Sequence, residues 1–141
     1  MCIRDRLVDT NPEDVYLHLG FDMDPEPDLD MYVDTLPSGR SEVDNSLTER
    51  VVLITAMPEA KRIRRNRVDK ALRIINNHQL GNWSPPHIAI RDDRQLVLSF
   101  PVNIPGTEVQ ISSELVVDAL SRVLSGWEEL APKLQNAGVW E

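Results

Sequence analysis

Strict alternation of apolar and polar residues is the feature that most constrains the fold of this chain. In the stretch "VYLHLGFDM", residues 15–23, every second side chain is apolar, and residues 96–104 repeat the pattern. Period-two alternation places the apolar side chains on one face of a strand, so each stretch predicts a half-buried β-strand. Antiparallel sheets commonly keep one face in contact with water. The pattern therefore favours an antiparallel sheet whose apolar face is turned to a core.

Three more strands are predicted beside these two. Residues 29–35 alternate again, and "RVVLITAM", residues 50–57, is a near-continuous apolar run typical of a more buried strand. "HIAIR", residues 87–91, precedes the turn "DDR" and predicts a hairpin with the strand at 96–104. Pro101 removes a backbone donor, so we expect the end of that last strand to lie at a sheet edge.

The stretches between the first three strands are polar. "DMDPEPDLD", residues 22–30, has two prolines and five acids and predicts a turn. Residues 36–49 are polar and rich in turn-forming residues, so they predict a loop.

A helical period begins at about Arg64. Val68, Leu72 and Ile75 fall on one line, which predicts that Leu72 packs against the sheet, and Gly81 is placed to cap the helix C-terminus. His78 lies in the last turn, where a positive charge is favoured by the helix dipole.

A second helix is predicted to follow Ser112, which is a good N-cap. It is expected to run for about five turns and to be disturbed by Pro132. Leu120 should be buried against the sheet. The residues of its apolar stripe are Val116, Leu120, Val123, Trp127, Leu130 and Leu134.

The resulting order, β-β-β-α-β-β-α, predicts the α+β class: an antiparallel sheet of about five strands with helices packed on one face. The length of 141 residues suits one domain. The opening "MCIRDR" resembles a translated sequencing-adapter scar, so residues 1–6 are expected to be an assembly artefact and residues 7–141 the domain.

The second half of the chain, about residues 50–135, resembles the YbjN-type family of bacterial proteins. The resemblance rests on "RVDKALRIINNHQLGNW", on the hairpin "HIAIRDDRQLVLSFPVNIPG" and on "ISSELVVDALSRVLSGWEEL". Members are described as sensory transduction regulators and are similar in fold to type III secretion chaperones. The resemblance implies a binding or chaperone-like role with no cofactor and no catalytic residue. It also implies an N-terminal helix, which is expected to be missing here.

The residues themselves give little support for an enzyme. No two of the six glycines are close enough to form a phosphate-binding loop, and the three histidines include no i,i+4 pair for zinc. The one cysteine excludes an internal disulfide. No apolar run reaches membrane length and no secretory signal is visible, so we expect a cytoplasmic protein with no membrane partner.

The acidic turn leaves one enzymatic alternative, a metal-dependent activity. Alternate carboxylates can bind a hard cation. The calcium-loop pattern fails, however, because Pro27 stands where glycine is needed and Val33 where a bidentate glutamate is needed. A solvated turn is the favoured interpretation. The acids concerned are Asp22, Asp24, Glu26, Asp28 and Asp30.

Seven cations within residues 61–73 leave a second alternative, nucleic-acid binding through a basic helix. The whole chain carries a net charge of −8, which repels a polyanion. Residues 1–60 hold fourteen acids and four bases. We therefore expect the cations to form a solvated face that pairs with the protein's own acidic loops, with no nucleic-acid partner.

The favoured function is a non-enzymatic protein-binding module, with a homodimer expected because the apolar band on the last helix is wide. The alternative is a monomer in which the missing N-terminal helix would cover that band. Trp127 is expected in the core and Trp140 in a loose tail. The residues proposed to contact a partner are Trp83, Val116, Leu120, Val123 and Trp127.

Overall fold

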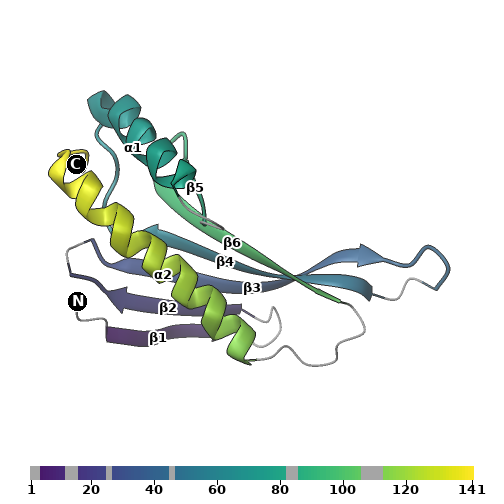
Figure 1. The fold of residues 1–141 in the computed structure, drawn as a ribbon. Helices are drawn as coiled ribbons and strands as arrows, with labels where there is room; N and C mark the ends of the chain where they lie inside the picture. The colour runs from purple at the N-terminus through teal and green to yellow at the C-terminus, as the bar shows by residue number, and fades with distance from the viewer. Residues whose placement is uncertain (1–3, 12–15, 25–26, 45–46, 82–85, 106–112) are drawn as a thin grey trace.

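One antiparallel sheet with both α-helices on the same face makes up the fold (Figure 1). The computed structural model describes residues 4–11, 16–24, 27–44, 47–81, 86–105 and 113–141. The six strands lie in the order β1-β2-β3-β4-β6-β5. The predicted α+β class and the five predicted strands are confirmed. The strands are β1 (Arg4–Asn11), β2 (Tyr16–Asp22), β3 (Leu29–Arg40), β4 (Leu47–Pro58), β5 (His87–Ile90) and β6 (Leu96–Pro105).

The sequence pattern did not predict β1. This strand begins at Arg4, within the stretch expected to be an assembly artefact, and pairs antiparallel with β2. Its sequence, "RDRLVDTN", has no alternation of apolar residues. An edge strand can be held by main-chain hydrogen bonds alone, and a pattern of side chains does not report those.

The loop predicted at residues 36–49 is wrong, because β3 and β4 continue through most of it as a long hairpin. Backbone pairing extends to Gly39↔Glu49 and Arg40↔Leu47, with register shifts around Gly39. The hairpin projects beyond the rest of the sheet (Figure 1). Polar residues form this part of the hairpin because cross-strand hydrogen bonds need no buried face.

Register explains which face of the sheet is buried. Met31 faces Ala56 across the β3–β4 pair, Val33 faces Ile54, and all four side chains are buried beneath the helices. β6 continues this buried face with Leu98, which pairs with Ala56. Pro101 pairs with β4 alone, because β5 reaches only as far as Ser99. The predicted edge position of Pro101 is confirmed.

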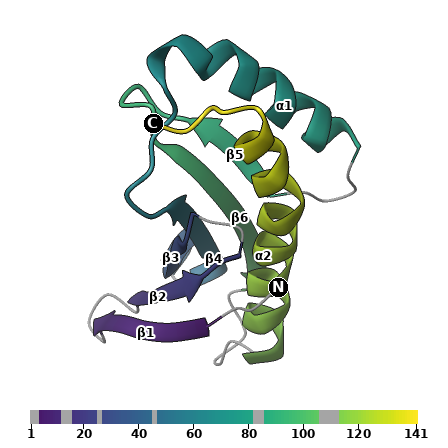
Figure 2. The same cartoon turned by 90° about the vertical axis from the view of Figure 1, so that its left-hand side faces the viewer.

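The helix α2 (Ser113–Asn136) crosses this buried face diagonally (Figures 1 and 2). It is longer than predicted and continues through Pro132, and Leu134 beyond the proline is fully buried. Packing of this last turn against the core therefore outweighs the backbone hydrogen bond that proline removes. Trp127 is fully buried, as predicted.

Trp140 is not in a loose tail. It is 7% exposed, and its ring lies 6.1 Å from that of Trp127. Trp140 forms a β-bridge with Ile63, which is fully buried, and its carbonyl accepts a 2.5 Å hydrogen bond from Arg64 Nε. Residues 139–141 are thereby fixed against residues 62–64, because Arg64 N also donates to Val139 O and Glu141 N to Arg62 O.

The helix α1 (Val68–Leu80) follows a 3-10 turn, η1 (Arg65–Arg67). Its buried residues are Ala71, Ile75 and His78, whereas Leu72 is 39% exposed. The prediction that Leu72 is buried against the sheet is therefore wrong. α1 lies at the β5 end of the sheet and packs against α2 (Figure 2), so its buried side is rotated away from the line through Leu72. Leu120 on α2 is half-buried and packs against the core.

His78 is buried between the helices instead of lying at a solvated helix end. Burial lowers the pKa of its imidazole; Lys133 on α2 acts in the same direction and Glu129 opposes both. The folded protein therefore favours the neutral side chain.

Two substitutions in α1 test the observed helix face. Ile75→Ala should lower the free energy of unfolding by about 2–5 kcal/mol, because it leaves a cavity in the core. Leu72→Ala should cost about 1 kcal/mol or less, since much of this side chain is in water before and after folding. Urea unfolding of both variants measures the difference. Equal losses, or a larger loss for Leu72→Ala, would contradict the assignment.

A pH series tests the burial of His78. Unfolded histidine binds a proton below about pH 6.5, whereas the lowered pKa delays protonation in the folded state. The free energy of unfolding should therefore fall as the pH falls below that value. His78→Gln should reduce this dependence, and His87→Gln, at an exposed position, should not. The same dependence of the free energy of unfolding on pH in both variants would contradict the burial of His78.

Candidate functional site

The face of the sheet opposite the helices is covered by no described element (Figure 2). We call it the uncovered face. It contains a band of apolar side chains, most of them half-buried by their neighbours, and Leu36 is 46% exposed. The apolar residues of this band are Leu36, Val51, Leu53, Met57, Val97 and Pro101.

The central strand β4 contributes most to this band. Val51, Leu53 and Met57 alternate with the buried residues of the same strand, so they point away from the helices. Leu36 lies opposite Val51 on β3, and Pro101 lies opposite Leu53 on β6. Cross-strand neighbours on one face lie about 5 Å apart, so Leu36, Val51, Leu53 and Pro101 form a continuous apolar surface. Thr55 lies between this surface and Met57.

A row of polar residues crosses the apolar band, with Met57 and Val97 on one side and the other members of the band on the other. The register places His18 opposite Tyr32, Tyr32 opposite Thr55, and Thr55 opposite Ser99. Ser99 in turn lies opposite His87 on the edge strand β5. The row therefore crosses the sheet from β2 to β5 at right angles to the strands.

At the β2–β3 end of this row, His18 is held in place by two neighbours. Its Nε2 lies 3.1 Å from Asp30 Oδ1, and its ring stacks on Tyr32 with 4.3 Å between the ring centroids and a 10° interplanar angle. Burial raises the pKa of the Tyr32 phenol, and the nearby Asp30 carboxylate raises it further. Among the described residues, no serine, threonine or cysteine is hydrogen-bonded to His18, so no nucleophile–base pair forms.

The acidic residues of the β2–β3 turn do not converge. Asp28 Oδ1 accepts a 2.8 Å hydrogen bond from Met23 N and so stabilises the turn, whereas Asp30 pairs with His18. Asp24 is exposed, and Glu26 lies outside the described residues. Within the described ranges, no three histidine, cysteine or carboxylate side chains are grouped closely enough to hold a metal ion.

The predicted pairing of the basic segment with the protein's own acidic loops stays a prediction, because Glu13, Asp14, Glu26 and Glu108 lie outside the described residues. The described residues include no ion pair to the cations between Lys61 and Arg73. The acidic turn contacts the residues just before this segment through a backbone hydrogen bond, in which Glu59 N donates to Asp28 O. Within the described ranges, Arg64 donates to Trp140 O, and the other cations of this segment have no ion pair.

The predicted partner residues fall into three groups. Val123 and Trp127 are fully buried, so the expectation that they contact a partner is wrong: the sheet already covers that side of α2. Val116 and Leu120 are half-buried and pack against the core. Trp83 lies outside the described residues.

The uncovered face was missed by the sequence analysis, although a signal for it exists. β4 is apolar at nearly every position from Val51 to Met57, a pattern that predicts a more buried strand. In the structure only one side is buried.

Comparisons of the chain with protein-family models, curated proteins and solved structures found no match. Among the described residues, no helix is long and apolar enough to cross a membrane.

The cluster around His18 can be tested by titration. Asp30→Asn should lower the pKa of Tyr32, because it removes a negative charge that disfavours the phenolate, while the larger contribution of burial remains. Absorbance of the ionised phenol measures this pKa, and Tyr32→Phe separates its signal from that of Tyr16. Asp34→Asn is the control and should have no effect. An unchanged pKa in Asp30→Asn would contradict the geometry.

Proposed function

We propose that this protein is a non-enzymatic protein-binding module that pairs with a second copy through the uncovered face. The observation that carries the proposal is the apolar band on that face, centred on Leu53 of the central strand. A sheet with one apolar face against helices and a second apolar face in water is unusual for an isolated domain. A second sheet packed about 10 Å away would cover the band.

The surface area supports association. The chain exposes 8747 Å². A compact monomer of 16.0 kDa is expected to expose about 7,400 Å², so the excess is roughly 1,300 Å². A stable interface needs about 800 Å² from each partner. The projecting β3–β4 hairpin contributes to this open shape (Figure 1).

A second copy is favoured over another occupant because the band can complement itself. Most soluble oligomers are symmetric homo-oligomers, and in a two-fold dimer the same patch is used on both subunits. On β4 this face is apolar at Val51, Leu53 and Met57 and is interrupted by Thr55, while on β3 Asp34 lies opposite Leu53 and Asp30 opposite Met57. Pairing centred on the β4–β6 side of the face, at Leu53 and Pro101, would place the Asp34 carboxylate at the margin of the contact instead of at the two-fold axis.

The resemblance to YbjN-type proteins points to the same class of function. It implies a binding or chaperone-like role, and secretion chaperones of similar fold commonly pair. Among the described strands, β5 pairs with β6 and lies at the edge of the sheet, so its other side offers backbone groups to which a partner strand can add. The protein would then act as a dimer that holds an extended segment of another protein.

The substitution Leu53→Lys tests the dimer. Leu53 pairs across the strands with Asp34, so a lysine there gains a favourable cross-strand charge pair in the monomer. In the dimer the same charge would be buried at the interface. Light scattering after size exclusion at about 100 μM should show a dimer for the parent and a monomer for Leu53→Lys, with unchanged circular dichroism.

Val117→Lys is the matched control. Val117 is 59% exposed and lies on α2, the surface that the sequence alone favoured for pairing. It should leave the dimer intact. A monomeric parent would refute the proposed pairing, and a dimer that is lost only in Val117→Lys would move the interface to α2.

A further inference from the structure

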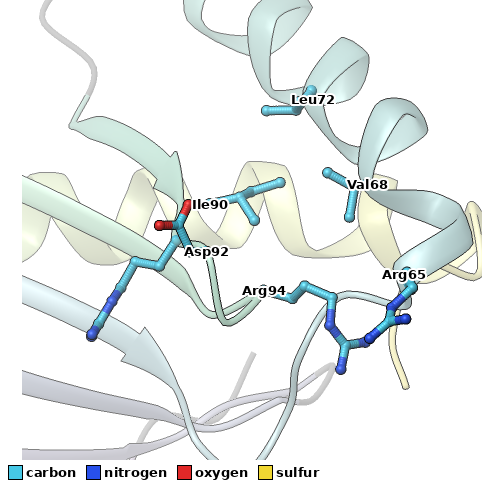
Figure 3. Close-up of a pocket in the computed structure, with 7 residues that line it drawn as sticks. Arg65, Val68, Leu72, Ile90, Asp92 and Arg94 are labelled. Carbon is cyan, nitrogen blue, oxygen red and sulfur yellow. The ribbon is translucent and has the colours of Figure 1, made fainter.

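We infer that a pocket between α1 and the β5–β6 turn binds an acidic peptide segment that carries an apolar side chain next to a carboxylate. The inference rests on the protein-binding role proposed above, but not on the dimer or on the uncovered face. The pocket has a volume of about 390 Å³ (Figure 3), within the range of ligand-binding cavities. Its lining residues are Arg65, Val68, Leu72, Ile90, Arg91, Asp92 and Arg94.

The pocket has an apolar part and a cationic part. Val68, Leu72 and Ile90 face the gap between α1 and the turn, with Arg65 and Arg94 toward one end (Figure 3). Leu72 is among the more exposed large apolar residues of the described chain. An apolar ligand group placed here would remove its side chain from water.

Arg94 is a rigidly placed cation. Its backbone has a φ of 68°, a left-handed conformation that costs a non-glycine residue free energy. Its Nη1 donates to Ile63 O and lies 3.0 Å from Glu141 Oε1. These bonds connect the turn to the segments around Ile63 and Glu141, which fixes the wall of the pocket before any ligand arrives.

Arg65 supplies positive charge that no described residue neutralises. It is exposed and forms no ion pair with any described residue. Lys61, Arg62 and Lys70 on the same segment likewise have no described ion pair. Arg91 is held only loosely, with its Nε 3.9 Å from Asp93. A carboxylate entering beside Leu72 would therefore meet two arginines that are available to donate.

The same features favour a peptide over a nucleic acid. No lining residue is aromatic, so the pocket offers no ring on which a base could stack. Asp92 lines the pocket, and the chain has a net charge of −8, which opposes the approach of a long polyanion. A short segment with one or two carboxylates beside a leucine matches both the positive charge of the lining arginines and the apolar part of the pocket.

The probe is the blocked peptide acetyl-Ser-Glu-Leu-Asp-Leu-Ser-amide, and its affinity is measured by calorimetry at low and high salt. We expect a dissociation constant on the order of 100 μM that weakens with salt. The same peptide with glutamine and asparagine in place of its acids should bind at least about tenfold more weakly.

The double variant Arg65→Gln, Arg91→Gln should weaken peptide binding at least about tenfold. Arg73→Gln, an exposed cation of α1 outside the lining, is the matched control and should bind like the parent. Arg94 is left unchanged because its guanidinium also supports the fold. The monomeric Leu53→Lys variant should bind the peptide normally, which separates this inference from the dimer.

Three results would overturn the inference. One is equal binding by the double variant and the parent. Another is tighter, arginine-dependent binding of a single-stranded oligonucleotide, which would make the basic segment a nucleic-acid site. The third is a change of oligomeric state in the double variant, which would make the occupant an acidic segment of a second copy.

Discussion

Coverage of the sheet on one side only is the constraint on which the rest of this structure depends. Six strands about 4.8 Å apart form a sheet roughly 24 Å wide, and α2 with its 24 residues is about 36 Å long. Laid diagonally, that one helix spans the full width of the sheet, and α1 extends the helical layer at the β5 end (Figure 2). Both α-helices of the described residues lie on one face, so neither covers the other face.

The sequence predicted those parts of the fold in which side-chain burial sets the pattern. Alternation at β2, β3 and β6 gave the strands and the buried face, because the faces of these strands differ in polarity. At β4 alternation did not show which face is buried, because Val51 and Leu53 are as apolar as their buried neighbours Val52 and Ile54. A run without alternation reports apolar character on both faces, but it cannot say whether a helix of the same chain covers each one.

Other features were missed because they depend on the backbone or on tertiary placement. The strand β1 and the far end of the β3–β4 hairpin are held by main-chain pairing, which leaves no apolar period to detect. In α1, the residues Leu72 and Ile75 are both apolar, and only the position of α2 decides that Ile75 is buried. Trp140 was expected to be loose because its stabilising partners, Ile63 and Arg64, lie more than seventy residues earlier in the chain.

The β5–β6 hairpin takes part in both candidate surfaces with different residues. Its turn lines the pocket through Arg91 and Arg94, whereas Val97 and Pro101 lie on the uncovered face. Because Arg94 anchors the turn to the backbone at Ile63, the hairpin cannot move freely toward either side. An apolar contact on one face and a charged contact at the turn can therefore form independently on one rigid element. This arrangement suits a protein that pairs through its sheet and holds an acidic partner segment at the edge.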